Sequence, residues 1–196
     1  MAKRIVPDQC CGVIIDVQEF FLRQLPKRHR ATVETNTRNF ATLLGYFRIP
    51  IVVTIERPLD DKGTLPQKIG RRLGSAAATF EKDFFDLTQE KPIRDHLRRL
   101  KKKQAIIAGS ETDVCVLQSC LGLLGLGFDV FVVEELLFSG ARNVESALTR
   151  MKDEGAVFLT YKTLYYELFQ AVDNDRQTLA DKFGPYPEDL PDTAVE

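Results

Sequence analysis

The chain of 196 residues is 44% hydrophobic and 28% charged, with a net charge of −1. This composition is typical of a folded globular protein and argues against intrinsic disorder. The balanced charge argues against a broad nucleic-acid or anionic-membrane surface, because both partners require excess positive charge. A chain of this length fits one domain and can bury enough surface to fold without disulfide or metal cross-links.

The N-terminal residues lack the pattern of a targeting or membrane-spanning segment. The first apolar run is about five residues long and ends in Asp16, whereas a signal-peptide core needs roughly 7 to 15 and a membrane span about 20. We therefore expect a cytoplasmic protein, in which thiols stay reduced. Its four cysteines match no zinc-ligand spacing and are expected to be free: Cys10, Cys11, Cys115 and Cys120.

Short apolar runs alternate with segments of helical periodicity along the chain. Strands are predicted over residues 11–15, 51–55, 79–82, 104–108, 128–133 and 157–160. Helices are predicted over residues 31–47, 92–100, 112–126 and 141–154, with a long loop over 56–78. This alternation predicts an α/β fold, in which helices cover both faces of an all-parallel sheet.

The composition changes at about Asp173. From there the chain holds seven acidic and two basic residues and three of its nine prolines. We predict a single domain over residues 1–196, with a core at about 8–172. The remainder, about 173–196, is predicted to be an acidic, proline-containing tail made of a final helix and a weakly structured end.

Cys115 lies where an open parallel sheet binds its ligands, outside the carboxyl end of a strand. It is expected in the first turn of the helix that follows the fourth predicted strand. The helix dipole and unpaired backbone N–H groups there favour a thiolate and can hold an oxyanion. The alternative is that Cys115 is a small buried hydrophobic residue, as most free cysteines are.

Asp16 and Lys82 are the other polar residues at predicted strand ends. A buried carboxylate such as Asp16 needs a partner, so it is either a helix cap or a site residue. Lys82 is flanked by aromatic residues, which is unusual if it is buried and ordinary if its ammonium reaches solvent. Together the two supply a base and a fixed cation, which a neutral thiol needs to become a nucleophile.

Three motifs occur in order along the chain. They are Val13-Ile-Ile-Asp-Val-Gln-Glu-Phe-Phe21, Thr79-Phe-Glu-Lys82 and Gly109-Ser-Glu-Thr-Asp-Val-Cys-Val116. With these motifs the chain resembles the isochorismatase-like cysteine hydrolases over roughly residues 8–172. The resemblance implies a Rossmann-like three-layer α/β/α sandwich with a six-stranded parallel sheet.

The resemblance also implies how a site would be built. Asp16, Lys82 and Cys115 would form the catalytic triad, and a cis peptide bond would join Ser110 to Glu111. The backbone N–H groups of Glu111 and Cys115 would form the oxyanion hole. The candidate substrate-binding residues are Gln18, Phe20, Phe21 and Thr112. Members of the branch that this chain resembles often form tetramers or octamers, so a homo-oligomer is expected.

The departures from the family pattern concern the metal. The nicotinamidase branch carries an aspartate and two histidines in the loop after the second strand, whereas residues 56–63 hold no histidine. The two histidines, His29 and His96, lie in basic helical contexts and are interpreted as solvated. The chain thus resembles the metal-free, poorly assigned branch, and no metal or other cofactor is expected. Glu111 and the acidic pair Glu134-Glu135 also depart from the family pattern.

Three functions follow from these features. The leading hypothesis is a hydrolase of a small amide or related C–N bond, which works through a thioester on Cys115. The first alternative is vinyl-ether hydrolysis of an isochorismate-like substrate, which uses Asp16 as an acid and needs no nucleophile. The second is a thiol-based redox or binding protein without hydrolytic activity. In the leading case the partner is a small-molecule substrate, with no nucleic acid and no membrane.

Overall fold

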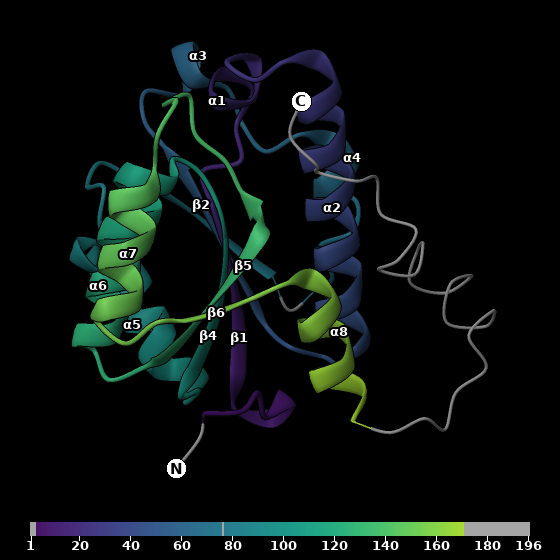
Figure 1. The fold of residues 1–196 in the computed structure, drawn as a ribbon, viewed down its shortest axis with the longest axis vertical. Helices are drawn as coiled ribbons and strands as arrows, with labels where there is room; N and C mark the ends of the chain where they lie inside the picture. Colours follow the sequence, from purple (N-terminus) through teal and green to yellow (C-terminus); the bar gives the residue numbers. More distant parts are fainter. Residues whose placement is uncertain (1–2, 76, 171–196) are drawn as a thin grey trace, which may run out of the picture.

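A computed structural model describes residues 3–75 and 77–170 and contains a six-stranded, all-parallel sheet (Figure 1). The strand order is β3-β2-β1-β4-β5-β6. The strands are β1 (Cys10–Ile15), β2 (Ile51–Glu56), β3 (Ala77–Lys82), β4 (Gln104–Gly109), β5 (Asp129–Leu137) and β6 (Val157–Leu159). The predicted fold class is therefore confirmed.

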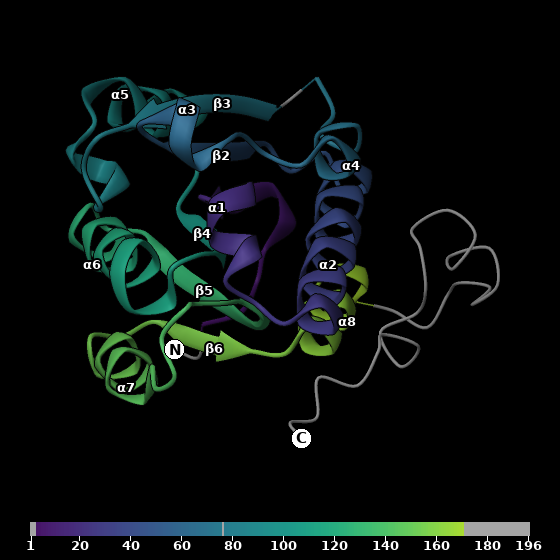
Figure 2. The same ribbon diagram turned by 90° about the horizontal axis from the view of Figure 1, so that it is seen from above.

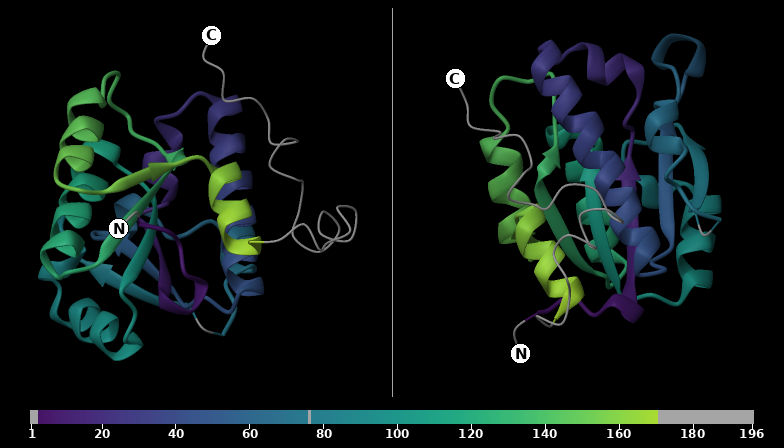
Figure 3. Two further views of the ribbon diagram at one scale, coloured as in Figure 1. Left: turned by 60° about the horizontal axis from the view of Figure 1, so that its bottom comes forward. Right: turned by 90° about the vertical axis from the view of Figure 1, so that its right-hand side faces the viewer.

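Helices cover the sheet on both faces, as Figure 2 shows from above. One layer consists of α2 (Lys27–Tyr46) and α8 (Tyr161–Phe169), and the other of α5 (Lys91–Leu100), α6 (Leu117–Gly125) and α7 (Glu145–Asp153). Figure 3 shows α8 beside α2, where the rings of Tyr46 and Phe169 stack at 5.8 Å. Short helices α1 (Glu19–Arg23), α3 (Leu59–Lys62) and α4 (Gln67–Gly70) lie in the connections, with 3₁₀ turns at Pro7–Gln9 and Leu87–Gln89.

The three central strands are buried along their whole length. Every residue of β1, β2 and β4 is buried, which is why their sequences are continuously apolar rather than alternating. Along β1, Cys10 and Ile14 face the core beneath α2 and α8. Cys11, Val13 and Ile15 face the second core, beneath α5, α6 and α7.

One glycine allows α2 to lie close to the sheet. A Cβ atom on Gly12 of β1 would come within 2.2 Å of Leu44 Cδ1 of α2. A side chain at position 12 would therefore displace the Leu44 side chain or the helix that carries it.

The structure differs from the sequence prediction mainly outside the strands. The predicted loop 56–78 contains the helices α3 and α4, and the predicted helix 112–126 begins as a π-helical turn, Thr112–Val116, before α6. The predicted strand 128–133 continues to Leu137. The helix α8 was not predicted. The prediction of a tail after residue 173 lies outside the described residues, so the single-domain interpretation of residues 1–196 stays a prediction.

No helix within residues 3–75 and 77–170 combines the length and the apolar character that a bilayer crossing requires.

Candidate active site

The strand order changes direction between β1 and β4. β1 is followed in the chain by β2 on one side, whereas β4, on its other side, leads to β5. The carboxyl ends of strands at such a switch point are where open α/β sheets bind ligands. Four chemically active side chains meet there: Asp16 after β1, Glu56 at the end of β2, Lys82 at the end of β3 and Cys115 after β4.

Asp16 turns the chain at the end of β1 and is held on both carboxylate oxygens. Its backbone is left-handed, with φ at 47°. Thr54 Oγ1 donates a hydrogen bond to Oδ1 at 2.8 Å, and the Lys82 ammonium pairs with Oδ2 at 2.7 Å. Burial raises the pKa of Asp16, and the opposing effects of Lys82 and Thr54 offset this only in part. Asp16 is therefore a better proton acceptor than a solvated aspartate.

Lys82 supplies the fixed cation of the site. The sequence left its burial open, and the structure shows a fully buried side chain. Its Nζ lies 2.7 Å from Asp16 Oδ2 and 3.3 Å from Glu56 Oε2. The distance from Nζ to Cys115 Sγ is 3.5 Å. Burial alone would lower the pKa of Lys82, but these three anionic or acidic neighbours outweigh it and raise the pKa. The lysine therefore stays an ammonium.

Cys115 lies in the π-helical turn, with 2% of its surface exposed. Its Sγ donates a hydrogen bond to Glu56 Oε2 at 2.9 Å. Burial raises the pKa of the thiol, and the Asp16 and Glu56 carboxylates raise it further against the effect of Lys82. In the resting site the thiol form is therefore favoured, although Lys82 on its own favours the thiolate. Cys115 is a thiol that requires a base.

Glu56 is the site residue that sequence reasoning missed. It was treated as the start of a loop without histidine, whereas it ends β2 and contacts Cys115, Lys82 and Lys62. A signal was present in the sequence, because Glu56 ends an otherwise apolar strand in the same way as Asp16 does. A buried carboxylate in that position requires a partner.

The four candidate substrate-binding residues lie in different environments. The buried Gln18 amide is engaged with the backbone of Glu56 and of Gly63. Phe21 packs in the core beneath α2. Thr112 is buried and lines a cavity of about 240 Å³ next to β5 and α7. Phe20 exposes 43% of its surface, so it is the candidate that is accessible from solvent.

The turn after β4 contains Glu111 and leads to Cys115, the two residues whose backbone N–H groups are predicted to form an oxyanion hole. The peptide bond between Ser110 and Glu111 is cis, and Ser110 Oγ donates to the carbonyl oxygen of Asp16 at 2.8 Å. Gly109 precedes this turn with φ at 127°, and a Cβ there would lie 1.9 Å from the carbonyl oxygen of Ile15. Only glycine therefore lets β4 end against β1.

The only convergent group of potential metal ligands among the described residues is Asp16, Glu56 and Cys115, whose ligand atoms lie within 4.8 Å of one another. The Lys82 ammonium is within 3.5 Å of an atom of each. A positive charge thus already stands where a cation would be coordinated, which does not fit a metal site. His96 is half-buried against Phe80, with ring centroids 5.1 Å apart, rather than solvated as expected.

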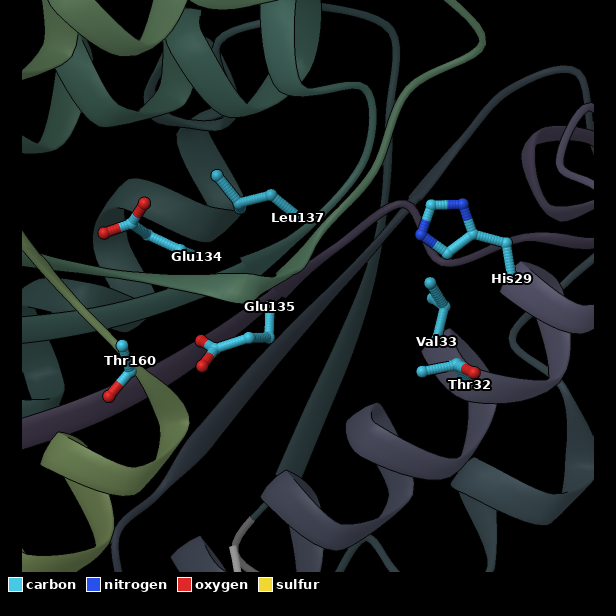
Figure 4. A pocket seen from close by; sticks show the side chains of 7 residues that line it. All are labelled: His29, Thr32, Val33, Glu134, Glu135, Leu137 and Thr160. Atoms are coloured by element: carbon cyan, nitrogen blue, oxygen red, sulfur yellow. The ribbon is translucent and has the colours of Figure 1, made fainter. Parts of the chain in front are cut away.

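A second cavity, of about 370 Å³, opens between α2 and the end of β5 (Figure 4). His29 borders it on one side, and Glu134 and Glu135 border it on the other. Glu135 Oε2 accepts a hydrogen bond from the backbone N–H of Tyr161 at 2.9 Å. This N–H is in the first turn of α8, where backbone N–H groups have no partner within the helix. The departure from the family pattern at Glu135 therefore has a structural role, and no triad residue lines this cavity.

Comparisons with known proteins agree on one family. A family model described as the Isochorismatase domain matches residues 10–163. A secreted isochorismatase effector, Isc1, from Phytophthora sojae (strain P6497) is 29% identical over 183 residues, which cover 84% of this chain and 79% of the relative.

Solved structures give the same result. The YcaC gene product from Escherichia coli, described as an octameric hydrolase of unknown specificity, has a TM-score of 0.85 and 25% identity over 93% of this chain and 90% of that chain. YcaC from Pseudomonas aeruginosa with hexane-2,5-diol and covalent acrylamide has a TM-score of 0.81 and 25% identity, over 89% and 87%. The nicotinamidase SaPncA from Staphylococcus aureus is similar in fold alone, with a TM-score of 0.67 and 18% identity over 77% and 98%.

Proposed function

The chain belongs to the isochorismatase family of hydrolases, and from this premise we propose that it is a cysteine-dependent hydrolase of a small amide or related C–N bond. The predicted family is confirmed by the comparisons, and the chain is more similar to the YcaC structure than to the nicotinamidase, as expected. One observation carries the proposal. A single buried ammonium, that of Lys82, lies 2.7 Å from the Asp16 carboxylate and 3.5 Å from the Cys115 sulfur.

The first chemical step is proton transfer from sulfur to a carboxylate. Asp16, whose pKa burial raises, accepts the proton of Cys115, and the Lys82 ammonium stabilises the thiolate that remains. The thiolate then attacks the carbonyl carbon of the amide. The backbone N–H groups of Glu111 and Cys115 are proposed to hold the oxyanion of the tetrahedral intermediate.

The second half of the reaction returns the enzyme to its resting state. Asp16 gives its proton to the departing amine as the C–N bond breaks, which leaves a thioester on Cys115 and an ionised Asp16. Asp16 then takes a proton from a water molecule, which attacks the thioester carbonyl. The carboxylic acid leaves, and the sulfur regains its proton through Asp16.

The comparisons support a reactive residue in relatives of this fold. The P. aeruginosa YcaC carries covalent acrylamide, a small electrophile that alkylates thiols. The isochorismate-type alternative draws support from the raised pKa of Asp16, which suits an acid as well as a base. The redox alternative requires a low-pKa thiolate, and the raised pKa of Cys115 disfavours it.

The remaining expectations belong to the same proposal. We propose a homo-oligomer, a tetramer or an octamer, because the E. coli YcaC structure is octameric. We also propose a cytoplasmic location, although the Phytophthora relative is named as secreted. Because the Lys82 ammonium supplies the cation, no metal is proposed. Exhaustive chelation is expected to leave turnover unchanged, and a large loss that added metal restores would contradict this.

The test is a screen of small amides with detection of released ammonia. The protein should release ammonia from at least one amide, and the Cys115→Ser protein should fall to background. Cys120→Ser is the matched control, because Cys120 is also buried but lies in α6 among apolar side chains, so it should retain activity. Ammonia release that survives Cys115→Ser would show that sulfur is not the nucleophile.

A further inference from the structure

The carboxylate of Glu56 is shared between three partners, one of which is the nucleophile. Oε2 accepts the Cys115 thiol at 2.9 Å and pairs with the Lys82 ammonium at 3.3 Å. Oε1 pairs with the ammonium of Lys62, which belongs to α3. The hydrogen bond of the thiol to Glu56, at 2.9 Å, is thus shorter than its contact with Lys82, at 3.5 Å. The Asp16 carboxylate also contacts Thr54 and Lys82.

Neighbouring side chains fix both the backbone and the carboxylate of Glu56. The Gln18 side chain accepts the backbone N–H of Glu56 at 2.7 Å and donates to its carbonyl at 3.0 Å. The Glu56 side chain is 8% exposed and is fixed at its tip by Lys62. Because the Glu56 side chain has so little conformational freedom, its Oε2 keeps the hydrogen bond from the Cys115 thiol.

We propose that Glu56 is a positioning residue that holds the proton on Cys115 before catalysis, and that Lys62 weakens this hold by drawing on the other carboxylate oxygen. The inference rests on the proposed role of Cys115 as the nucleophile. Hydrogen bonding of a thiol to an ionised carboxylate favours the protonated form of sulfur. The family triad has one carboxylate beside the thiol, and this chain has a second.

The charges that act on Cys115 come from the carboxyl ends of β1, β2 and β3. Asp16 and Glu56 favour the thiol, and Lys82 favours the thiolate. Lys62 acts through Glu56, whose pKa is lowered because the hydrogen bond from Cys115 and the Lys62 and Lys82 ammonium groups together outweigh its burial. Glu111, half-buried in the turn after β4, interacts electrostatically with Glu56 and Lys62.

Two substitutions are expected to shift the pKa of the Cys115 thiol in opposite directions. Glu56→Gln removes the negative charge and keeps the shape, so the thiolate should form at lower pH. Lys62→Met leaves Glu56 with one cation fewer, so the thiolate should form at higher pH. The measurement is the rate at which methyl methanethiosulfonate, a small neutral thiol reagent, modifies Cys115 as a function of pH. Peptide mass spectrometry separates Cys115 from the other three cysteines.

Glu56→Gln is expected to lower the midpoint of the rate–pH profile by at least one pH unit. At a pH below the midpoints of both proteins, Cys115 should then be modified about tenfold faster in Glu56→Gln. Lys62→Met should shift the midpoint upward. Glu34→Gln makes the same chemical change on a partly buried carboxylate of α2 that pairs with Arg30 at 3.0 Å, and it should change the rate by about twofold at most. Glu56→Asp keeps the charge while withdrawing the oxygen from sulfur, and should lie between the original protein and Glu56→Gln.

An unchanged or raised midpoint in Glu56→Gln would overturn the inference, and Glu56→Asp decides the matter in the same way if Glu56→Gln does not fold. Because the labelling needs no substrate, it is independent of the proposed hydrolysis. A shifted midpoint in a protein that hydrolyses no amide would reject the proposed function alone. Amide hydrolysis that depends on Cys115, without a shifted midpoint, would reject the role of Glu56 alone.

Discussion

Lys82 shows how one buried side chain can organise a site. A buried ammonium is costly unless anions surround it, and here Asp16, Glu56 and Cys115 lie around its Nζ. Its burial could not be read from the sequence, because aromatic neighbours fit both a buried lysine and one whose tip reaches water. The strand-end positions of Asp16 and Cys115 were readable, since buried strands end visibly where apolar runs stop.

Asp16 and Lys82 are predicted to act as one unit. Asp16→Asn keeps the shape of the site but removes the base, so kcat/KM should fall by about 10²–10⁴-fold. Lys82→Met should cause a loss of similar size. Residues that act together are non-additive, so the double variant should be little worse than the poorer single one. The measurement is kcat/KM on one hydrolysed amide, with circular dichroism to confirm folding.

The control for this pair is Asp95→Asn, the same change on a surface aspartate of α5, which should leave kcat/KM unchanged. Strictly multiplicative losses would contradict a single unit and place Asp16 and Lys82 in separate steps.

The raised pKa of Asp16 sets the acidic limb of the pH profile. Asp16 must be ionised to accept a proton, so kcat/KM should be lost as pH falls through its pKa, which burial holds above the ordinary 3.8. Lys82 lowers that pKa through its charge, so Lys82→Met should move the limb of the residual activity to higher pH. Lys91→Met, at an exposed lysine of α5, should not move it. A limb that stays in place or moves to lower pH in Lys82→Met would show that another group is titrating.

At the scale of elements, the sequence predicts strands better than connections. All six strands were predicted. The central strands β1, β2 and β4 are buried and largely apolar runs, whereas the edge strand β3 is only partly buried. The four-residue helices α3 and α4 were missed, since they are too short to show helical periodicity. The π-helical turn at Thr112–Val116 was predicted as ordinary helix, because five residues are too few to reveal a different period in the apolar pattern.

The contact between α2 and β1 gives a stability prediction. Gly12→Ala would place a methyl group 2.2 Å from Leu44 Cδ1, so the free energy of unfolding should fall by about 1–3 kcal/mol, as in other overpacked cores. Gly45→Ala is the matched control, because a Cβ on this glycine of α2 meets nothing within 4 Å. It should leave stability unchanged or raise it by up to about 1 kcal/mol. Urea unfolding followed by circular dichroism measures both, and equal effects would contradict the packing argument.

At the scale of the whole molecule, the proposed homo-oligomer gives a prediction of the mass in solution. Phe84 and Phe85, which follow β3, are both more than half exposed, so they are candidates for burial between copies in the proposed oligomer. Light scattering coupled to size exclusion should give a mass four or eight times the 22.2 kDa of the chain. A mass of 22.2 kDa that is independent of concentration would contradict the proposed homo-oligomer.

The Gln18 side chain extends the sheet beyond the point where β1 ends. The backbone pairing of β1 with β2 reaches Ile15 and Thr54, and Asp16 then turns the chain away with its left-handed φ. The amide of Gln18 continues in its place, because it offers one acceptor and one donor to the backbone of Glu56, as a peptide group does. A glutamate at position 18 would keep the acceptor, lose the donor and place a carboxylate against the backbone carbonyls of Glu56 and Gly63. The identity of this residue is therefore fixed by the chemistry of the backbone that it imitates.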